Sequence, residues 1–152
     1  IGIDMTPDMI ELAQKNAEKL RTSNVVFKLG SIESISQPDN TVDLVISNCV
    51  IALSNRKRRI FSEILRVLKP HGRMVISDVV SDKPLPAEIR PSPADWLACV
   101  GGAAVMSQYI QLIAETGFTG IEVLKKEPSG PRTTGWQSSL INLTLRAYKP
   151  TC

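Results

Sequence analysis

Three short apolar segments in the first part of the chain each lead into residues that could do chemistry. Asp4 ends the first segment, Glu33 follows the second, and Asn48 and Cys49 follow the third. A carboxylate can accept hydrogen bonds from the hydroxyls of a ribose or from the amino group of an adenine. In an open parallel sheet, ligands bind outside the carboxyl ends of the strands. If the three segments are neighbouring strands, these residues surround one candidate nucleoside site.

The spacing of apolar residues predicts the elements that must hold this site. We expect strands at residues 1–4, 25–29, 42–47, 73–80, 121–124 and 140–148, and helices at 6–20, 60–68, 94–105 and 107–116, with a proline-rich loop at 81–93. Strands and helices that alternate through short loops are typical of an α/β fold. We expect a Rossmann-like domain with a mostly parallel sheet and helices on both faces.

The composition of the chain indicates which classes of binding partner the protein can have. The 18 basic and 15 acidic residues give a net charge of +3, and four basic residues adjoin at 56–59. Because no aromatic residues interleave with it, this cluster fits a solvated helix start better than a nucleic-acid track. No apolar stretch approaches the roughly 20 residues of a membrane span, and no signal peptide is visible. We therefore expect a cytoplasmic protein with no nucleic-acid and no membrane partner.

Each candidate residue also has a purely structural interpretation. Asp4 can simply cap the helix that follows it, and Glu33 alone is a weak sign. One bound nucleoside would explain both positions, with the backbone of Ile32 against the base. Cys49 can be a packing cysteine after a buried strand. Asp78 either faces the site at a strand end or caps a turn, and the residues leave both interpretations open.

Seven motifs then follow one another along the chain. They are Gly2-Ile3-Asp4-Met5-Thr6, Gly30-Ser31-Ile32-Glu33, Ile46-Ser47-Asn48-Cys49-Val50-Ile51, Arg66-Val67-Leu68-Lys69-Pro70, Ser77-Asp78-Val79, Leu85-Pro86-Ala87-Glu88-Ile89-Arg90 and Trp96-Leu97-Ala98-Cys99-Val100-Gly101-Gly102-Ala103. In kind and order they resemble segments of the arsenite methyltransferase family, to about residue 125. The strand-end motifs are general to methyltransferases of this fold, whereas the two cysteine motifs are specific.

The resemblance implies transfer of a methyl group from S-adenosylmethionine to thiolate-bound arsenic(III), a detoxification reaction served by a thiol reductant. The small-molecule substrate would be arsenite or its thiol conjugates. The cofactor-binding residues expected on this basis are Asp4, Met5, Ile32, Glu33 and Asn48. The resemblance also implies that Cys49 and Cys99 bind the arsenic and are catalytic, and soft thiolates do select soft ions. In an apolar helix, Cys99 can equally be a packing residue, and Cys152 has no motif around it.

The chain also departs from the family pattern. His71, the only histidine, replaces a usual glycine and fits a surface turn. The pattern has a strand, a glycine-rich loop and another arsenic-binding cysteine before the position of Ile1, so we expect an N-terminally truncated domain. The absent strand would lie between those that end at Asp4 and Ser47. We expect two exposed strand edges, weak cofactor affinity and possible self-association.

The expected organisation is a single methyltransferase domain over residues 1–152. Its cofactor-binding core would cover 1–80, a substrate or lid insertion 81–117, and C-terminal strands 118–152. Two other activities stay open beside arsenite methylation. In the first, the protein methylates carbon or oxygen on a small molecule such as a quinone precursor. In the second, it is a non-catalytic fragment whose role is only to bind arsenicals.

Overall fold

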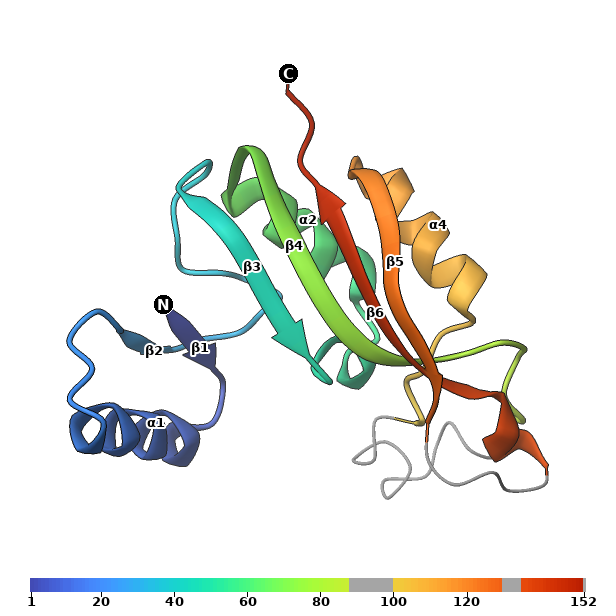
Figure 1. Ribbon diagram of the computed structural model, residues 1–152, viewed down its shortest axis with the longest axis horizontal. Helices are drawn as coiled ribbons and strands as arrows, with labels where there is room; N and C mark the ends of the chain where they lie inside the picture. The colour runs from blue at the N-terminus through green and yellow to red at the C-terminus, as the bar shows by residue number, and fades with distance from the viewer. Residues whose placement is uncertain (88–99, 130–134, 152) are drawn as a thin grey trace.

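The protein was analysed as a computed structural model that describes residues 1–87, 100–129 and 135–151 (Figure 1). Its strands form two separate sheets. The first holds β1 (Gly2–Asp4) and β2 (Phe27–Leu29), and the second runs in the order β3 (Val42–Asn48), β4 (Leu68–Ser81), β6 (Leu140–Tyr148) and β5 (Thr119–Pro128). The helices are α1 (Pro7–Lys19), α2 (Lys57–Val67) and α4 (Met106–Thr116), with 3-10 turns η1 (Ile51–Leu53) and η2 (Trp136–Ser139). The expected α/β class is confirmed.

The N-terminal unit consists of β1, α1 and β2. The two strands pair in parallel, with Gly2 opposite Phe27. A Cβ atom on Gly2 would lie 2.6 Å from the Phe27 ring, so glycine is what lets this ring cover the strand. Pro7 begins α1, where its fixed φ angle suits the first helical position. No residue of α1 is buried.

The four-stranded sheet is mixed. β3 and β4 run parallel, whereas β6 runs antiparallel to both β4 and β5. This sheet therefore has one parallel and two antiparallel pairings over the described residues, because β6 enters between β4 and β5, and it is not the mostly parallel sheet that was expected. Figure 1 shows α2 and α4 together on one face of this sheet, and α1 beside the two-stranded sheet. The expected placement of helices on both faces of the sheet is not seen among the described helices that pack on it, α2 and α4.

The core lies between the four-stranded sheet and the two helices. Its fully buried side chains come from the α2 stripe, from α4 and from the facing sides of β4 and β6; they include Ile60, Phe61, Ile64, Leu68, Met74, Ile76, Tyr109, Ile113, Leu143 and Leu145. Each such side chain contributes roughly 1.5–3 kcal/mol when it leaves water. The helix stripe predicted at 60–68 thus forms the main contact.

Two strand edges face each other across the gap between the sheets. In the described residues, β1 pairs only with β2 and β3 pairs only with β4, so the outer edges of β1 and β3 carry no strand. Apolar side chains of β3 are exposed at this edge, and Ile46 is 72% exposed. The expectation of two exposed strand edges is confirmed.

Several sequence-based boundaries are wrong, and two of them matter most. The expected helix at 94–105 is not continued at residues 100–105, which form a turn and a bridge from Ser81 to Val105, and its first part lies outside the described residues. Gly101 and Gly102 disfavour a helix there. β4 begins at Leu68 rather than at residue 73, because Leu68 already has an extended backbone after α2. No helix within the described ranges is long and apolar enough to span a membrane.

Candidate cofactor site

A cavity of about 860 Å³ lies between the N-terminal unit and β3. Its volume is in the range of roughly 300–1,000 Å³ that small-molecule sites occupy. The lining comes from β1, from the length of β3 and from the turns that follow β1, β2 and β3; among the lining residues are Asp4, Met5, Ile32, Glu33 and Asn48. All five residues expected to bind a cofactor therefore lie around one cavity. The sequence alone could not show that they meet.

Asp4 lies where β1 passes into α1. Its Oδ1 accepts a hydrogen bond of 2.8 Å from the backbone N–H of Thr6. The hydroxyl of Thr6 makes no capping bond, so the carboxylate of Asp4 orders the entry into the helix. A carboxylate has about four acceptor positions, so this bond leaves capacity for a ligand hydroxyl. The capping and binding interpretations of Asp4 are compatible.

Glu33 is held on several sides. Its Oε1 accepts a bond of 2.6 Å from the Ser54 hydroxyl, and Arg56 approaches Oε2 at 3.8 Å. Its backbone carbonyl accepts a bond of 2.8 Å from Nε of Arg59, and its N–H donates to Oγ of Ser31. The carboxylate is thus fixed at the cavity wall as a hydrogen-bond acceptor, the property that recognition of an adenine amino group needs.

The basic cluster at 56–59 does more than form a solvated face. Arg59 binds the Glu33 carbonyl, Nζ of Lys57 donates to the Ser54 carbonyl at 2.6 Å, and Arg58 pairs with Glu115 of α4. The cluster lies at the start of α2 and Arg56, Arg58 and Arg59 are exposed, as expected, but its side chains also make these specific contacts. Sequence reasoning also missed Ser54, because nothing in its spacing links it to Glu33.

Cys49 follows β3 in an unusual backbone conformation. Its φ angle is +53°, in the left-handed region that disfavours residues other than glycine, and its N–H donates to the Ser77 carbonyl of β4 at 2.9 Å. The neighbours Asn48 and Val50 line the cavity, whereas the exposed Cys49 does not. Residues in this region concentrate at functional sites. The turn therefore places Cys49 between two residues that line the cavity.

Asp78 fits neither of its two sequence interpretations. It is 2% exposed, and its carboxylate accepts bonds from the Val79 N–H at 3.1 Å and from the Tyr109 hydroxyl at 3.2 Å. The backbone of Ala52 also bonds to it. Burial raises the pKa of Asp78 to about 6. Asp78 therefore ties β4 to α4 and η1 inside the core.

The remaining sequence-based candidates fall outside this site. Cys99 and Cys152 lie outside the described residues, so the expected meeting of Cys49 with Cys99 stays a prediction. His71 is exposed, as expected, but it lies within β4 with a φ angle of +62° rather than in a turn before the strand. In the parts of the chain that the structure describes, no three His, Cys, Asp or Glu residues gather closely enough to hold a metal ion.

Comparison with known proteins agrees with this arrangement. The sequence profile of the methyltransferase-domain family matches residues 1–128. The chain is 38% identical to an arsenite methyltransferase of Halobacterium salinarum over 99% of this chain and 40% of the relative. It is also 38% identical to the human arsenite methyltransferase, over 77% of this chain and 34% of the relative.

A solved structure agrees as well. The arsenic(III) S-adenosylmethionine methyltransferase from Chlamydomonas reinhardtii matches with a TM-score of 0.82 at 33% identity, over 99% of this chain and 54% of that one. The present chain thus spans between 34% and 54% of the length of these three proteins. The expected Rossmann-like fold and the similarity to arsenite methyltransferases are confirmed. With its profile match over most of its length, this chain belongs to the methyltransferase-domain family.

Proposed function

We propose that this protein transfers the methyl group of S-adenosylmethionine to thiolate-bound arsenic(III). The observation that carries the proposal is the common cavity between β1, β3 and the turns after β1 and β2, which Asp4, Met5, Ile32, Glu33 and Asn48 line together. Similarity to arsenite methyltransferases supports the choice of acceptor. The cavity and this similarity together support arsenite methylation as the activity of the protein.

The cavity wall offers what an adenosine needs. In the proposed complex, the Asp4 carboxylate accepts from the ribose hydroxyls, while Glu33 accepts from the adenine amino group. Met5 and Ile32 supply apolar contact to the base, and Met5 is 76% exposed and therefore available for it. Asn48, at the end of β3, lies toward the sulfonium end. Charged acceptors make these bonds worth about 1.5–3 kcal/mol each.

Arsenic(III) would be held by the thiolates of Cys49 and Cys99. Its lone pair attacks the methyl carbon, an As–C bond forms, and the C–S bond breaks with its electron pair left on the sulfur of S-adenosylhomocysteine. The arsenic is formally oxidised by two electrons, and a thiol reductant returns it to the trivalent state while forming a disulfide. Correct positioning of the two reactants alone can contribute about 7–11 kcal/mol.

Single cysteine replacements test the acceptor. The protein is incubated with arsenite, S-adenosylmethionine and a thiol reductant, and methylated arsenic is measured by mass spectrometry. Cys49→Ser and Cys99→Ser should each reduce the product at least about 100-fold, because a hydroxyl is a poor ligand for a soft ion. Cys152→Ser is the matched control and should leave the product unchanged. Full arsenite methylation by Cys49→Ser would refute the assignment.

The same variants separate the alternatives. If the reaction instead modifies a quinone precursor, methylation of that compound should survive both replacements. If the protein only sequesters arsenicals, arsenite should bind to the unmodified protein without any methylated product. Replacements Asp4→Asn and Glu33→Gln then report on the donor site, since each should weaken S-adenosylhomocysteine binding by about tenfold or more.

The proposal also includes the cellular compartment, the division of the chain into regions and the binding partners. A cytoplasmic, reducing compartment fits a reaction that needs free thiolates. We keep residues 1–80 as the cofactor-binding core, 81–117 as the substrate or lid insertion and 118–152 as the C-terminal strands. We propose no nucleic-acid or membrane partner. The open edges of β1 and β3 favour self-association, which sedimentation velocity at increasing protein concentration would detect.

A further inference from the structure

The segment from Ser31 to Asn40 carries two of the proposed adenine contacts but has little structure of its own. Apart from a bridge between Ser31 and Ser34, its residues belong to neither a helix nor a strand. Ile32 and Glu33 lie at its start. Loops of this kind move unless other parts of the protein hold them. What fixes this segment therefore decides the geometry of the adenine side of the cavity.

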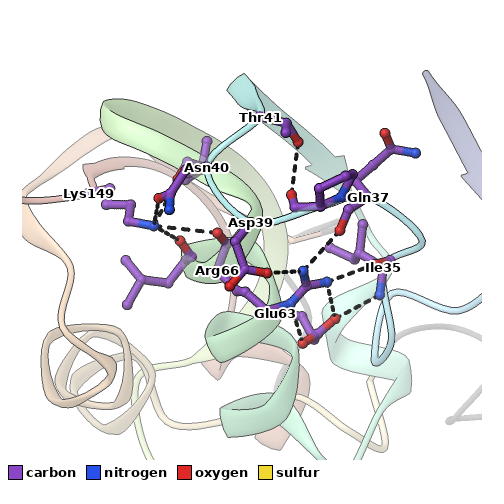
Figure 2. A network of polar contacts seen from close by, with 11 residues as sticks. Ile35, Gln37, Asp39, Asn40, Thr41, Glu63, Arg66 and Lys149 are labelled. Atoms are coloured by element: carbon purple, nitrogen blue, oxygen red, sulfur yellow. Dashed lines mark hydrogen bonds and ion pairs between the residues drawn. The ribbon is translucent and has the colours of Figure 1, made fainter.

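The guanidinium of Arg66 on α2 binds this segment at three places (Figure 2). It donates to the backbone carbonyl of Ile35 at 2.8 Å and to that of Gln37 at 2.9 Å. It also donates to Oδ1 of Asp39 at 2.6 Å. A guanidinium presents five donors in a fixed planar fork, so a single side chain can hold all three acceptors at once.

Glu63, one turn earlier on α2, completes the attachment. Its carboxylate accepts two bonds of 2.9 Å from Arg66, and Oε2 also accepts a bond of 2.9 Å from the Ile35 N–H. Both backbone groups of Ile35 are therefore bound by one ion pair. The hydrogen bond from Arg66 is the main reason that the pKa of Glu63 lies below its usual value.

The helix that carries this pair is itself firmly held. Ile60, Phe61 and Ile64 are buried in the main core. At the end of α2, the N–H groups of Asn40 and Thr41 donate to its last carbonyls at 3.0 Å and 2.9 Å. The segment is thus attached to a rigid element both at Ile35 and at its own end.

We infer that Glu63 and Arg66 are positioning residues for the adenine side of the cofactor site. They fix the backbone of residues 31–40, so that Ile32 and Glu33 stay at the cavity wall. This inference rests on the proposed cofactor site. It adds two residues that do not line the cavity and act only through the loop.

Arg66→Lys is the most informative variant. It keeps the positive charge and the salt bridge to Glu63, but an ammonium cannot reproduce the planar fork. Glu63→Gln is the second variant, because it keeps an acceptor for Ile35 and loses the charge. Lys69→Gln serves as the matched control, since it removes an ion pair of the same length, 2.9 Å to Asp43, away from the loop.

Two measurements are needed on the full chain. Hydrogen exchange of the peptide covering residues 31–40 should accelerate at least about tenfold in Arg66→Lys, the equivalent of one charge-assisted bond, while β4 keeps its protection. Binding of S-adenosylhomocysteine is then compared with that of S-inosylhomocysteine, which lacks the adenine amino group. The preference of the unmodified protein for the adenine ligand should fall at least about fivefold in Arg66→Lys and in Glu63→Gln. Lys69→Gln should change neither quantity.

The outcomes distinguish this inference from the proposed function. Unchanged exchange at 31–40 overturns it directly. Faster exchange with an intact adenine preference also overturns it, because the pair would then have only a structural role. If the unmodified protein shows no preference for adenine, the proposed cofactor site is what fails, and the positioning role falls with it. Faster exchange at residues 31–40 together with a reduced preference for the adenine ligand supports both the positioning role and the proposed cofactor site.

Discussion

The hydroxyl of Tyr109 on α4 lies 3.2 Å from Oδ2 of Asp78 on β4 and donates a hydrogen bond to it in the protein interior. The Tyr109 ring also packs edge-on against Phe61, with ring centroids 5.4 Å apart. Burial is the main cause that raises the pKa of both groups, of Asp78 to about 6 and of Tyr109 well above its usual value. The contact joins a helix to the sheet through a carboxylate that titrates near neutrality.

Asp78 should make stability depend on pH between about 4 and 6. Its pKa is 3.8 as a reference value and about 6 in the folded protein, so the folded state binds the proton more tightly. The stabilisation is complete below pH 4 and is lost as the pH rises through 6, and it amounts to about 3 kcal/mol. In Asp78→Asn this dependence should vanish.

Urea denaturation at pH 4, 5, 6 and 7.5 measures this effect. The difference in the free energy of unfolding between the two proteins isolates the Asp78 contribution, because the other groups titrate in both. That difference should shift by about 3 kcal/mol in favour of Asp78→Asn between pH 4 and 7.5. A difference that stays constant with pH would show that Asp78 titrates normally.

Tyr109→Phe should remove the hydrogen bond and keep the ring packing. The loss leaves a buried carboxylate with one donor fewer, which costs about 1–3 kcal/mol. The cost should be larger at pH 8 than at pH 4, since the bond to an ionised acceptor is stronger. Tyr148→Phe, the same change on a partly exposed side chain, should alter stability by no more than about 0.5 kcal/mol. Equal effects at both pH values would contradict the role assigned to the hydroxyl.

Lys149→Met should weaken the end of α2. The Lys149 ammonium donates to the carbonyls of Leu65 at 2.7 Å and Leu68 at 2.8 Å, and to Oδ1 of Asn40 at 2.8 Å (Figure 2). A cation at this place satisfies terminal carbonyls and complements the helix dipole. We expect a loss of about 1.5–3 kcal/mol in urea denaturation.

A lysine on the exposed strand β5 provides the control for that change. Lys126→Met removes the same charge and should leave the free energy of unfolding within about 0.5 kcal/mol of the unmodified protein. Hydrogen exchange locates the effect, because Lys149→Met should loosen the last turn of α2 first. If both variants lose the same stability, the loss reflects net charge rather than the end of the helix.

Gly72→Ala should destabilise the first part of β4. An added Cβ atom would lie 2.8 Å from the Lys69 carbonyl oxygen and 3.2 Å from that of Asp43, and both belong to the backbone. Overpacking of this kind costs about 1–3 kcal/mol. At Gly30 the same atom would meet only a methyl group of Ile3 at 3.4 Å, so Gly30→Ala should cost clearly less in the same thermal or urea experiment. Equal stability of the two variants would refute the argument.

Local patterns in the sequence were enough to place most elements. The apolar stripe at 60–68 predicted the buried face of α2, and the alternation at 140–148 predicted β6 with the bounds that the structure has. These signals are local, because each depends on side chains a few residues apart on one helix or strand. The strand ends at Asp4 and Asn48, and Glu33 in the turn after β2, were identified in the same way.

Contacts between residues far apart in the chain determined how these elements are arranged. That these strand ends surround one cavity, that β6 enters between β4 and β5, and that β1 and β3 face each other with open edges all depend on pairings far apart in the chain. The attachment of residues 31–40 by Arg66 and the burial of Asp78 against Tyr109 are of the same kind. The sequence alone determined which residues end the strands. Only the tertiary structure decided what they contact, because a hydrogen bond between distant residues leaves no periodic signal along the chain.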